Sequence, residues 1–204
     1  MAENERKFIN ICIWLAAILL LVRLLISWID VKSMWETGHI FILCYSFFGF
    51  IGEAIGITVI VMAVFNKKAW RWKLLRWLHD IPVLAKKYNG EFISDYDGKK
   101  RSGTMIIDQT FLTVAVQLKT EESNSRSLTA SISKVQGVQY LIYTYLNEPR
   151  AEIQERSPIH YGTAMLNICN PMILEGNYFN GRKSRGSMKF EACGENCKLK
   201  NASD

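Results

Sequence analysis

The chain has 204 residues, of which 49% are hydrophobic and 22% are charged, and its formal net charge at pH 7 is +6. Five of the basic residues fall between Lys67 and Arg76, directly after a long apolar stretch. The charge elsewhere is therefore too small to indicate a nucleic-acid-binding domain, and we expect no nucleic acid polymer as a partner.

Two long apolar stretches lie near the start of the chain. The first runs from Phe8 to Ile29 with Arg23 as its only charge. The second runs from Ile40 to Phe65 with Glu53 as its only charge. Crossing about 30 Å of hydrocarbon takes roughly 20 helical residues. A cleaved signal peptide would have a shorter apolar core followed by a small-residue cleavage site. The sequence therefore predicts two membrane-spanning helices joined by a short loop, 30–39.

The charges that flank the two stretches predict their orientation. Arg6 and Lys7 precede the first stretch and five basic residues follow the second, whereas the loop 30–39 has one lysine and two acids. By the positive-inside rule, both termini are expected in the cytoplasm and the loop outside it. Disulfide bonds are not expected in a cytoplasmic C-terminal part.

The cysteines do not predict a metal centre. Cys12 and Cys44 lie inside the apolar stretches, where they behave as small apolar residues. Cys193 and Cys197 form a C-x-x-x-C pair that lacks a second pair of ligands. We therefore expect neither a metal nor a cofactor, and we expect the polar tail 194–204 to be disordered.

One group in the second stretch is unusual for its depth. Glu53 lies near the middle of that stretch, where an ionisable side chain is costly and faces a partner or water. It is flanked by Gly52 and Gly56, a small-x-x-x-small pattern that lets helices approach closely. Two interpretations follow: a protonated Glu53 packed against the first helix, or a group that lines an assembly of several chains.

Arg23 is the nearest candidate partner for Glu53. It lies about 9 Å from the outer end of its stretch, whereas Glu53 lies about 20 Å from that end. A direct ion pair is therefore expected to be strained, and Arg23 has the alternative of extending towards the headgroups. We assign Arg23, Gly52, Glu53 and Gly56 to membrane assembly.

The periodicity changes after the basic segment. A short helix is predicted from Lys73 to Leu84, with Pro82 marking its end or a kink. From Tyr88 onward, apolar and polar residues alternate, as in Phe111–Lys119, which is typical of strands with one wet face. The predicted strands are 90–96, 103–109, 111–119, 127–135, 138–146, 160–168, 173–179 and 186–193.

Eight short strands with no helical pattern between them predict an antiparallel up-and-down barrel or a small sandwich. Closure is favoured because it removes exposed edges, and eight strands leave room for side chains or one small ligand. A weak repeat, Gly90-Glu-Phe92 and Gly176-Asn-Tyr178, predicts two similar hairpins with glycines at bulges or sharp bends. The fold class is therefore membrane-anchored all-β. The expected segments are a cytoplasmic N-terminus (1–7), two spans (8–65), a basic linker (66–87), an eight-stranded antiparallel β-barrel (88–193) and the tail.

Several short motifs carry a family resemblance. They are Trp77-Leu-His-Asp-Ile-Pro82, Tyr88-Asn-Gly90-Glu-Phe92, His160-Tyr-Gly162-Thr, Leu174-Glu-Gly176-Asn-Tyr178-Phe-Asn-Gly-Arg182 and Arg185-Gly186. With the two spans, they resemble the two-transmembrane β-strand-rich effectors that are associated with CD-NTase (SMODS) enzymes in bacterial CBASS anti-phage systems. The resemblance implies a cytoplasmic barrel that binds a cyclic dinucleotide from a partner CD-NTase. It also implies that the bound protein oligomerises and disrupts the inner membrane, which kills the infected cell.

A cyclic dinucleotide has two phosphates and two base faces, so its site needs cations or backbone N–H donors and planar groups for stacking. Basic residues occur in three loops, at Lys99, Lys100 and Arg101, at Arg182, Lys183 and Arg185, and at Arg150, Arg156, His160 and Tyr161. The face of strand 138–146 that carries Tyr143, Tyr145 and Asn147 lines the barrel mouth in one interpretation, and is ordinary strand surface or core in the other. We predict ligand binding by Arg101, Tyr143, Tyr145, His160, Arg182 and Arg185.

An enzyme is the class that the sequence favours least. It has no G-x-S-x-G, H-E-x-x-H or P-loop motif, and its three histidines lie in different segments. The alternative to a signal-gated membrane effector is a membrane-tethered lipid-binding or scaffold barrel without lethal activity. The cavity of such a barrel would be apolar rather than basic and aromatic.

Overall fold

The computed structural model describes residues 3–193, which form two compact units, one up to His79 and the other from Asp80 onward. The predictions for the tail 194–204, including its Cys197, fall outside the described residues.

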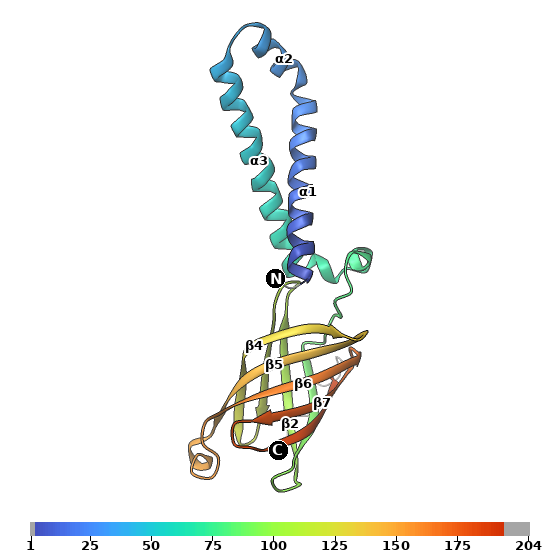
Figure 1. Cartoon of the computed structure of the whole chain (residues 1–204), viewed down its shortest axis with the longest axis vertical. Coiled ribbons are helices and arrows are strands. Elements are labelled where there is room, and N and C mark those ends of the chain that lie inside the picture. Colours follow the sequence, from blue (N-terminus) through green and yellow to red (C-terminus); the bar gives the residue numbers. More distant parts are fainter. Residues whose placement is uncertain (1–2, 194–204) are drawn as a thin grey trace, which may run out of the picture. The chain divides into compact units, whose positions relative to one another are not determined.

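The first unit is a helical hairpin, built from α1 (Glu3–Ile26), α2 (Trp28–Glu36) and α3 (Ile40–Lys67) (Figure 1). The segments Glu5–Ile26 and Ile40–Lys67 are each long and apolar enough to cross a bilayer. The protein is therefore membrane-associated through two candidate spanning helices, as the sequence predicts.

The connection between the two spans differs from the predicted loop. Helical hydrogen bonds continue across the junction, since Ser27 N donates to Arg23 O and Val31 N donates to Ser27 O, both at 3.0 Å. The chain therefore extends its first arm through α2 before it reverses near Gly38, whose φ of 72° favours glycine. The non-helical part of the connection is confined to residues 37–39.

The predicted helix Lys73–Leu84 is present only in part. Two short 3-10 segments follow α3, η1 (Ala69–Arg71) and η2 (Lys73–Leu78). At His79 the backbone is extended, with φ −155° and ψ 155°. Pro82 disfavours helical backbone at Ile81, so a helix through to Leu84 is also disfavoured by the sequence.

The second unit is a closed eight-stranded antiparallel barrel. Its strands are β1 (Lys87–Ser94), β2 (Lys100–Gln109), β3 (Val114–Thr120), β4 (Ser123–Val135), β5 (Val138–Pro149), β6 (His160–Asn170), β7 (Ile173–Asn180) and β8 (Arg185–Ala192). Consecutive strands pair, and β1 also pairs with β8, which closes the barrel. All eight predicted strands are present, and the barrel is confirmed over the sandwich.

Apolar side chains fill the barrel at the end where the chain enters β1. Tyr88 anchors the entering segment, because its hydroxyl accepts from Ala85 N at 2.8 Å and donates to Pro171 O at 2.6 Å. Gln109 holds the same segment, accepting from Leu84 N and donating to Pro82 O. The side chains packed at 0% exposure are Tyr88, Met105, Leu141, Ala164, Leu166, Leu174 and Phe190. This end of the barrel is therefore a closed core.

The predicted pair of similar hairpins corresponds to β1–β2 and β7–β8. The two register shifts of the barrel, at Ser127/Thr129 and Asn167/Asn170, do not involve glycine. A Cβ on Gly176 would lie 2.0 Å from Met165 O on the neighbouring strand, so this glycine permits a close approach of two strands. The glycines of the repeat therefore lie where neighbouring strands approach closely, and not at the bulges that were one of the two predictions.

Candidate functional site

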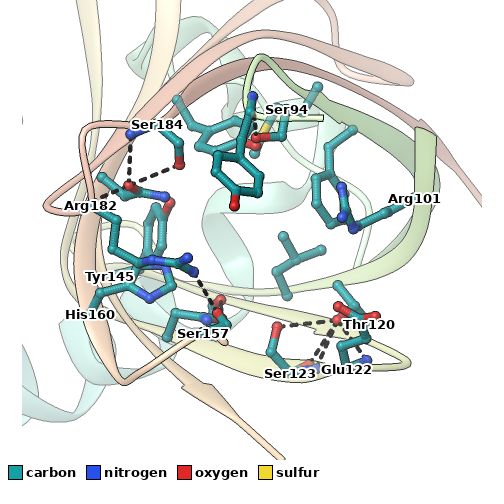
Figure 2. Close-up of a pocket in the computed structure, with 18 of the residues that line it drawn as sticks. Ser94, Arg101, Thr120, Glu122, Ser123, Tyr145, Ser157, His160, Arg182 and Ser184 are labelled. Atoms are coloured by element: carbon teal, nitrogen blue, oxygen red, sulfur yellow. Dashed lines mark hydrogen bonds between the residues drawn. The ribbon is translucent and has the colours of Figure 1, made fainter. Parts of the chain in front are cut away.

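An open cavity of about 410 Å³ occupies the other end of the barrel (Figure 2). Its rim comes from the β1–β2, β3–β4, β5–β6 and β7–β8 connections, which all lie at the end opposite the closed core. The volume is in the range of small-molecule sites, which are roughly 300–1,000 Å³. An eight-stranded barrel can be filled by side chains or can hold one small ligand. In this barrel one end is filled by side chains, and the other end has room for a ligand.

Four aromatic rings form the deeper walls of the cavity. Tyr143 and Tyr145 of β5 have ring centroids 5.9 Å apart and are tilted by 47°. Phe92 of β1 and Tyr178 of β7 make an edge contact at 6.3 Å. The β5 face that carries Tyr143, Tyr145 and Asn147 therefore points into the barrel and lines the cavity. Rings of this kind offer planar surfaces for stacking.

Glycines on neighbouring strands fix the position of several rings. In each case the glycine is the register partner of an aromatic residue, and an added Cβ would collide with the ring. The pairs are Gly90 with Phe190, Gly162 with Tyr145 and Gly186 with Tyr178. At Gly162 the Cβ would lie 2.4 Å from both Cζ and the hydroxyl oxygen of Tyr145. The sequence motif His160-Tyr-Gly162 thus leaves the space that this tyrosine occupies.

Burial raises the pKa of Tyr143 and of Tyr145, so both hydroxyls are neutral at physiological pH. We expect these two to titrate last among the eight tyrosines in an ultraviolet absorbance titration of the folded protein. Because their folded pKa exceeds the ordinary value of about 10, their contribution to stability is present below that pH. It is lost as the pH rises further. Tyr143→Phe is expected to shorten the last step of the titration, and an unchanged last step would contradict the burial.

Small polar side chains form a band between the rings and the rim. Ser125 Oγ donates to Asn147 Oδ1 at 2.7 Å, and Ser184 Oγ donates to Asn180 Oδ1 at 3.0 Å. The serine, threonine and asparagine side chains of the band are Ser94, Thr120, Ser123, Ser125, Asn147, Ser157, Asn180 and Ser184. Most of them were missed at the sequence level. The period-two spacing of Ser123, Ser125 and Ser127 was the available signal, but the fourth strand was predicted to begin only at Ser127.

Arg101 lines the cavity, and its positive charge is compensated by Asp97. Its Nη1 donates to Asp97 Oδ1 at 3.1 Å, and its Nη2 donates to Asp97 Oδ2. The Arg101 guanidinium lowers the pKa of the Asp97 carboxyl to about 2, so the pair stays ionised at neutral pH. Arg156 also pairs with an acid, through a single hydrogen bond that its Nη2 donates to Glu122 Oε1. Neither acid was a candidate at the sequence level.

Arg182 is bound differently. Its Nη1 donates to Ser157 Oγ at 2.7 Å and its Nη2 donates to Arg156 O at 3.0 Å, both of which are neutral acceptors (Figure 2). Among the described residues it forms no ion pair with a carboxylate. Figure 2 shows Arg182 across the cavity from Arg101. Arg182 therefore supplies the mouth with a positive charge that no acid among the described residues neutralises.

The structure brings five of the six predicted ligand residues together. Arg101, Tyr143, Tyr145, His160 and Arg182 all line the cavity. His160 Nδ1 lies 2.8 Å from Pro158 O, which fixes the orientation of its ring. Arg185 lies outside the lining, since its side chain is 83% exposed and pairs with Asp95. Of the other basic-loop residues, Arg156 lines the cavity, whereas Lys99, Lys100, Arg150, Tyr161 and Lys183 do not.

In the helical hairpin, Arg23 and Glu53 do form a direct ion pair, contrary to the expected strain. Arg23 Nε lies 2.9 Å from Glu53 Oε2, and the guanidinium also packs 4.8 Å above the ring of Phe50. The expected strain came from counting each residue from the end of its own apolar stretch, which left out α2. With α2 included, Arg23 lies as far before Glu36 as Glu53 lies after Ile40, so the two charges are level.

The glycines beside Glu53 face away from the first helix. Ala54 and Thr58 are buried in the hairpin, whereas Gly52 and Gly56 are exposed on the other side of α3. A Cβ built on either glycine meets no atom within 4 Å. Their face is therefore open to a further helix.

Comparison with known proteins gives a consistent result. The family model described as "Cap15, cyclic dinucleotide receptor domain" matches residues 79–192, which include the whole barrel. The chain is 29% identical over 194 residues to CD-NTase-associated protein 15 of Staphylococcus schleiferi, covering 94% of this chain and 98% of that protein. It is 34% identical over 147 residues to CD-NTase-associated protein 15 of Yersinia aleksiciae, covering 67% of each.

Proposed function

This chain belongs to the Cap15 family of cyclic dinucleotide receptors, and from that premise we propose that ligand binding makes its spanning helices assemble and disrupt the membrane. The protein is a two-transmembrane β-barrel effector of CBASS anti-phage defence, as the sequence motifs indicate, and its barrel binds a cyclic dinucleotide. The proposed outcome is death of the infected cell. The proposed location is the bacterial inner membrane, with both termini and the barrel in the cytoplasm, because the basic residues flank the spans on that side.

The chemistry of the cavity supports a ligand that is both anionic and aromatic. Arg182 offers a guanidinium to a phosphate, and hydrogen bonds to charged groups are the stronger ones. The rings of Tyr145 and Tyr178 offer stacking surfaces, while the serine and asparagine band offers donors and acceptors to base edges. The lipid-carrier alternative required an apolar cavity, and three arginines and two acids in the lining argue against it.

The ligand acts by changing an equilibrium between single and assembled chains. It does so only if it binds the assembled form more tightly than the single one. Moving that equilibrium from 1:99 to 99:1 takes about 5.5 kcal/mol of differential binding. We propose that this free energy comes from the contacts at the barrel mouth.

A thermal-shift screen of the full chain in detergent tests the ligand class. The panel contains cyclic di-AMP, cyclic di-GMP and cyclic GMP-AMP, with the matching linear dinucleotides and a fatty acid as controls. We expect one cyclic species to raise the unfolding temperature saturably, with about 2.7 kcal/mol of stabilisation at 100 times its Kd. A response to the fatty acid with none to a cyclic dinucleotide would favour the lipid carrier.

Assembly of the spans is tested at the open glycine face of α3. We expect Gly56→Leu to prevent membrane depolarisation in cells that produce a cyclic dinucleotide, while ligand affinity stays unchanged. The single hairpin tolerates the larger side chain because the space beside Gly56 is empty, so the loss would report on contacts between chains.

The matched control for Gly56→Leu is Val61→Leu, which adds bulk at an exposed position on a different face of α3. This control should depolarise the membrane like the wild type. Full activity of Gly56→Leu would remove the glycine face from the assembly.

A further inference from the structure

β4 changes its pairing along its length. Its first part pairs with β3 on one side, where Asn124, Ser125 and Arg126 face residues 117–119, and with β5 on the other. After the register shift between Ser127 and Thr129, residues 129–135 pair with β5 alone. Within the described part of the chain, no backbone hydrogen bond joins residues 129–135 to β3. In the described part of the barrel, the end of β4 therefore has a free strand edge.

The free edge of β4 is exposed. Alternate N–H and C=O groups of an antiparallel strand point away from its partner, so about half of those in 129–135 have no strand beside them. No residue of β4 after Ser125 is buried, and Leu128 and Val135 are 57% and 46% exposed. The segment has no proline and only one charge, Lys134. A long exposed edge that lacks proline and has few charged side chains tends to pair with a strand of another chain.

We propose that the β4 edge, residues 129–135, pairs with the same edge of a second copy of this chain. The sequence is self-complementary in an antiparallel arrangement centred on Ile132. On the outer face, Thr129 then lies opposite Val135, and Ser131 lies opposite Ser133. On the inner face, Lys134 lies opposite Ala130. No charge faces a like charge, and the small and β-branched pairs suit a two-stranded contact.

The same strands link this edge to the ligand cavity. Ser123 and Ser125 of β4 line the cavity on one side of the register shift, and the free edge begins on the other side. β5 carries Tyr143 and Tyr145 in the cavity wall and pairs with β4 along its whole length (Figure 1). A ligand that contacts these side chains therefore restrains both strands that hold the edge. The inference rests on the proposed ligand-driven assembly and names its interface.

Paired charge substitutions on the full chain test the edge. Ser131→Lys/Ser133→Lys places lysine opposite lysine twice in the proposed contact, and Ser131→Glu/Ser133→Glu does the same with glutamate. Each variant alone is expected to need roughly tenfold more protein for assembly, measured by light scattering in detergent with the cyclic dinucleotide selected by the screen. An equal mixture of the two variants is expected to assemble like the wild type.

The control Thr163→Lys/Ser187→Lys adds the same charge to the outer face of β6 and β8, whose edges are both paired, and should assemble normally. Hydrogen exchange supplies a second readout, with protection of the amides of 129–135 expected when the wild type assembles. Normal assembly of the lysine variant alone, or no recovery in the mixture, would overturn the edge contact. A wild type that binds ligand and stays monomeric would instead overturn the proposed function.

Discussion

Replacing Arg182 with alanine is expected to weaken binding of the cyclic dinucleotide by roughly 10- to 100-fold, since a hydrogen bond to a charged group contributes about 1.5–3 kcal/mol. Arg182 is the guanidinium in the cavity lining that no described carboxylate neutralises. Its present acceptors, Ser157 Oγ and Arg156 O, are neutral, so a phosphate would be the stronger partner. Isothermal titration calorimetry of the full chain in detergent measures the change.

The control for Arg182 lies in the same turn. Lys183 does not line the cavity, and its φ of 63° is one that asparagine tolerates. Lys183→Asn therefore removes one positive charge near the mouth without removing a cavity group, and we expect its affinity to stay within about twofold of the wild type. Equal losses from both variants would mean that the overall charge of the turn, not the position of Arg182, determines binding.

The second large effect is expected at Glu53. Glu53→Ala leaves Arg23 without its partner inside the membrane, where an arginine at mid-depth costs about 2.5–3.5 kcal/mol. We expect this variant to lose membrane depolarisation while its ligand-induced thermal shift is unchanged. A dye that reports membrane potential in cells, together with the thermal shift of the purified chain, measures the two quantities separately.

A double variant identifies the reason for that loss. Arg23→Leu/Glu53→Leu removes both charges, so no unpaired charge remains in the hydrocarbon. Recovery of depolarisation would mean that the pair only keeps the hairpin in place. Continued loss would mean that Glu53 itself takes part in the assembly. A reduced ligand affinity in Glu53→Ala would contradict the assignment of this residue to the membrane step.

The strands and their closure were predictable because period-two alternation is a local signal that the barrel requires of every strand. The same alternation placed Tyr143 and Tyr145 on one face of their strand but left open whether that face lines the barrel, and the structure places it inside. The pairing of Arg101 with Asp97 and of Arg156 with Glu122 could not be predicted. It depends on how each loop folds and on which loops meet at the rim, which spacing along the chain does not determine.

Two errors have specific physical causes. Arg182 and Arg185 lie three residues apart and were treated alike, but a turn and the start of β8 separate them, so one lines the cavity and the other pairs with Asp95 outside it. The direct contact of Arg23 with Glu53 was misjudged because a polar segment, Trp28–Glu36, continues the helix. Charged residues in that segment indicated a loop, whereas its backbone forms helical hydrogen bonds.

The level placement of Arg23 and Glu53 also bears on how the protein is made. During synthesis, the first span would leave the ribosome before Glu53, the partner of Arg23, because Glu53 lies 30 residues later in the chain. The first apolar stretch carries Arg23 as its only charge and the second carries Glu53, and these two charges compensate each other only in the hairpin. Insertion of the two spans as a pair is therefore favoured over insertion of one span after the other. A chain that ends between the two spans would keep its first span in the bilayer less stably.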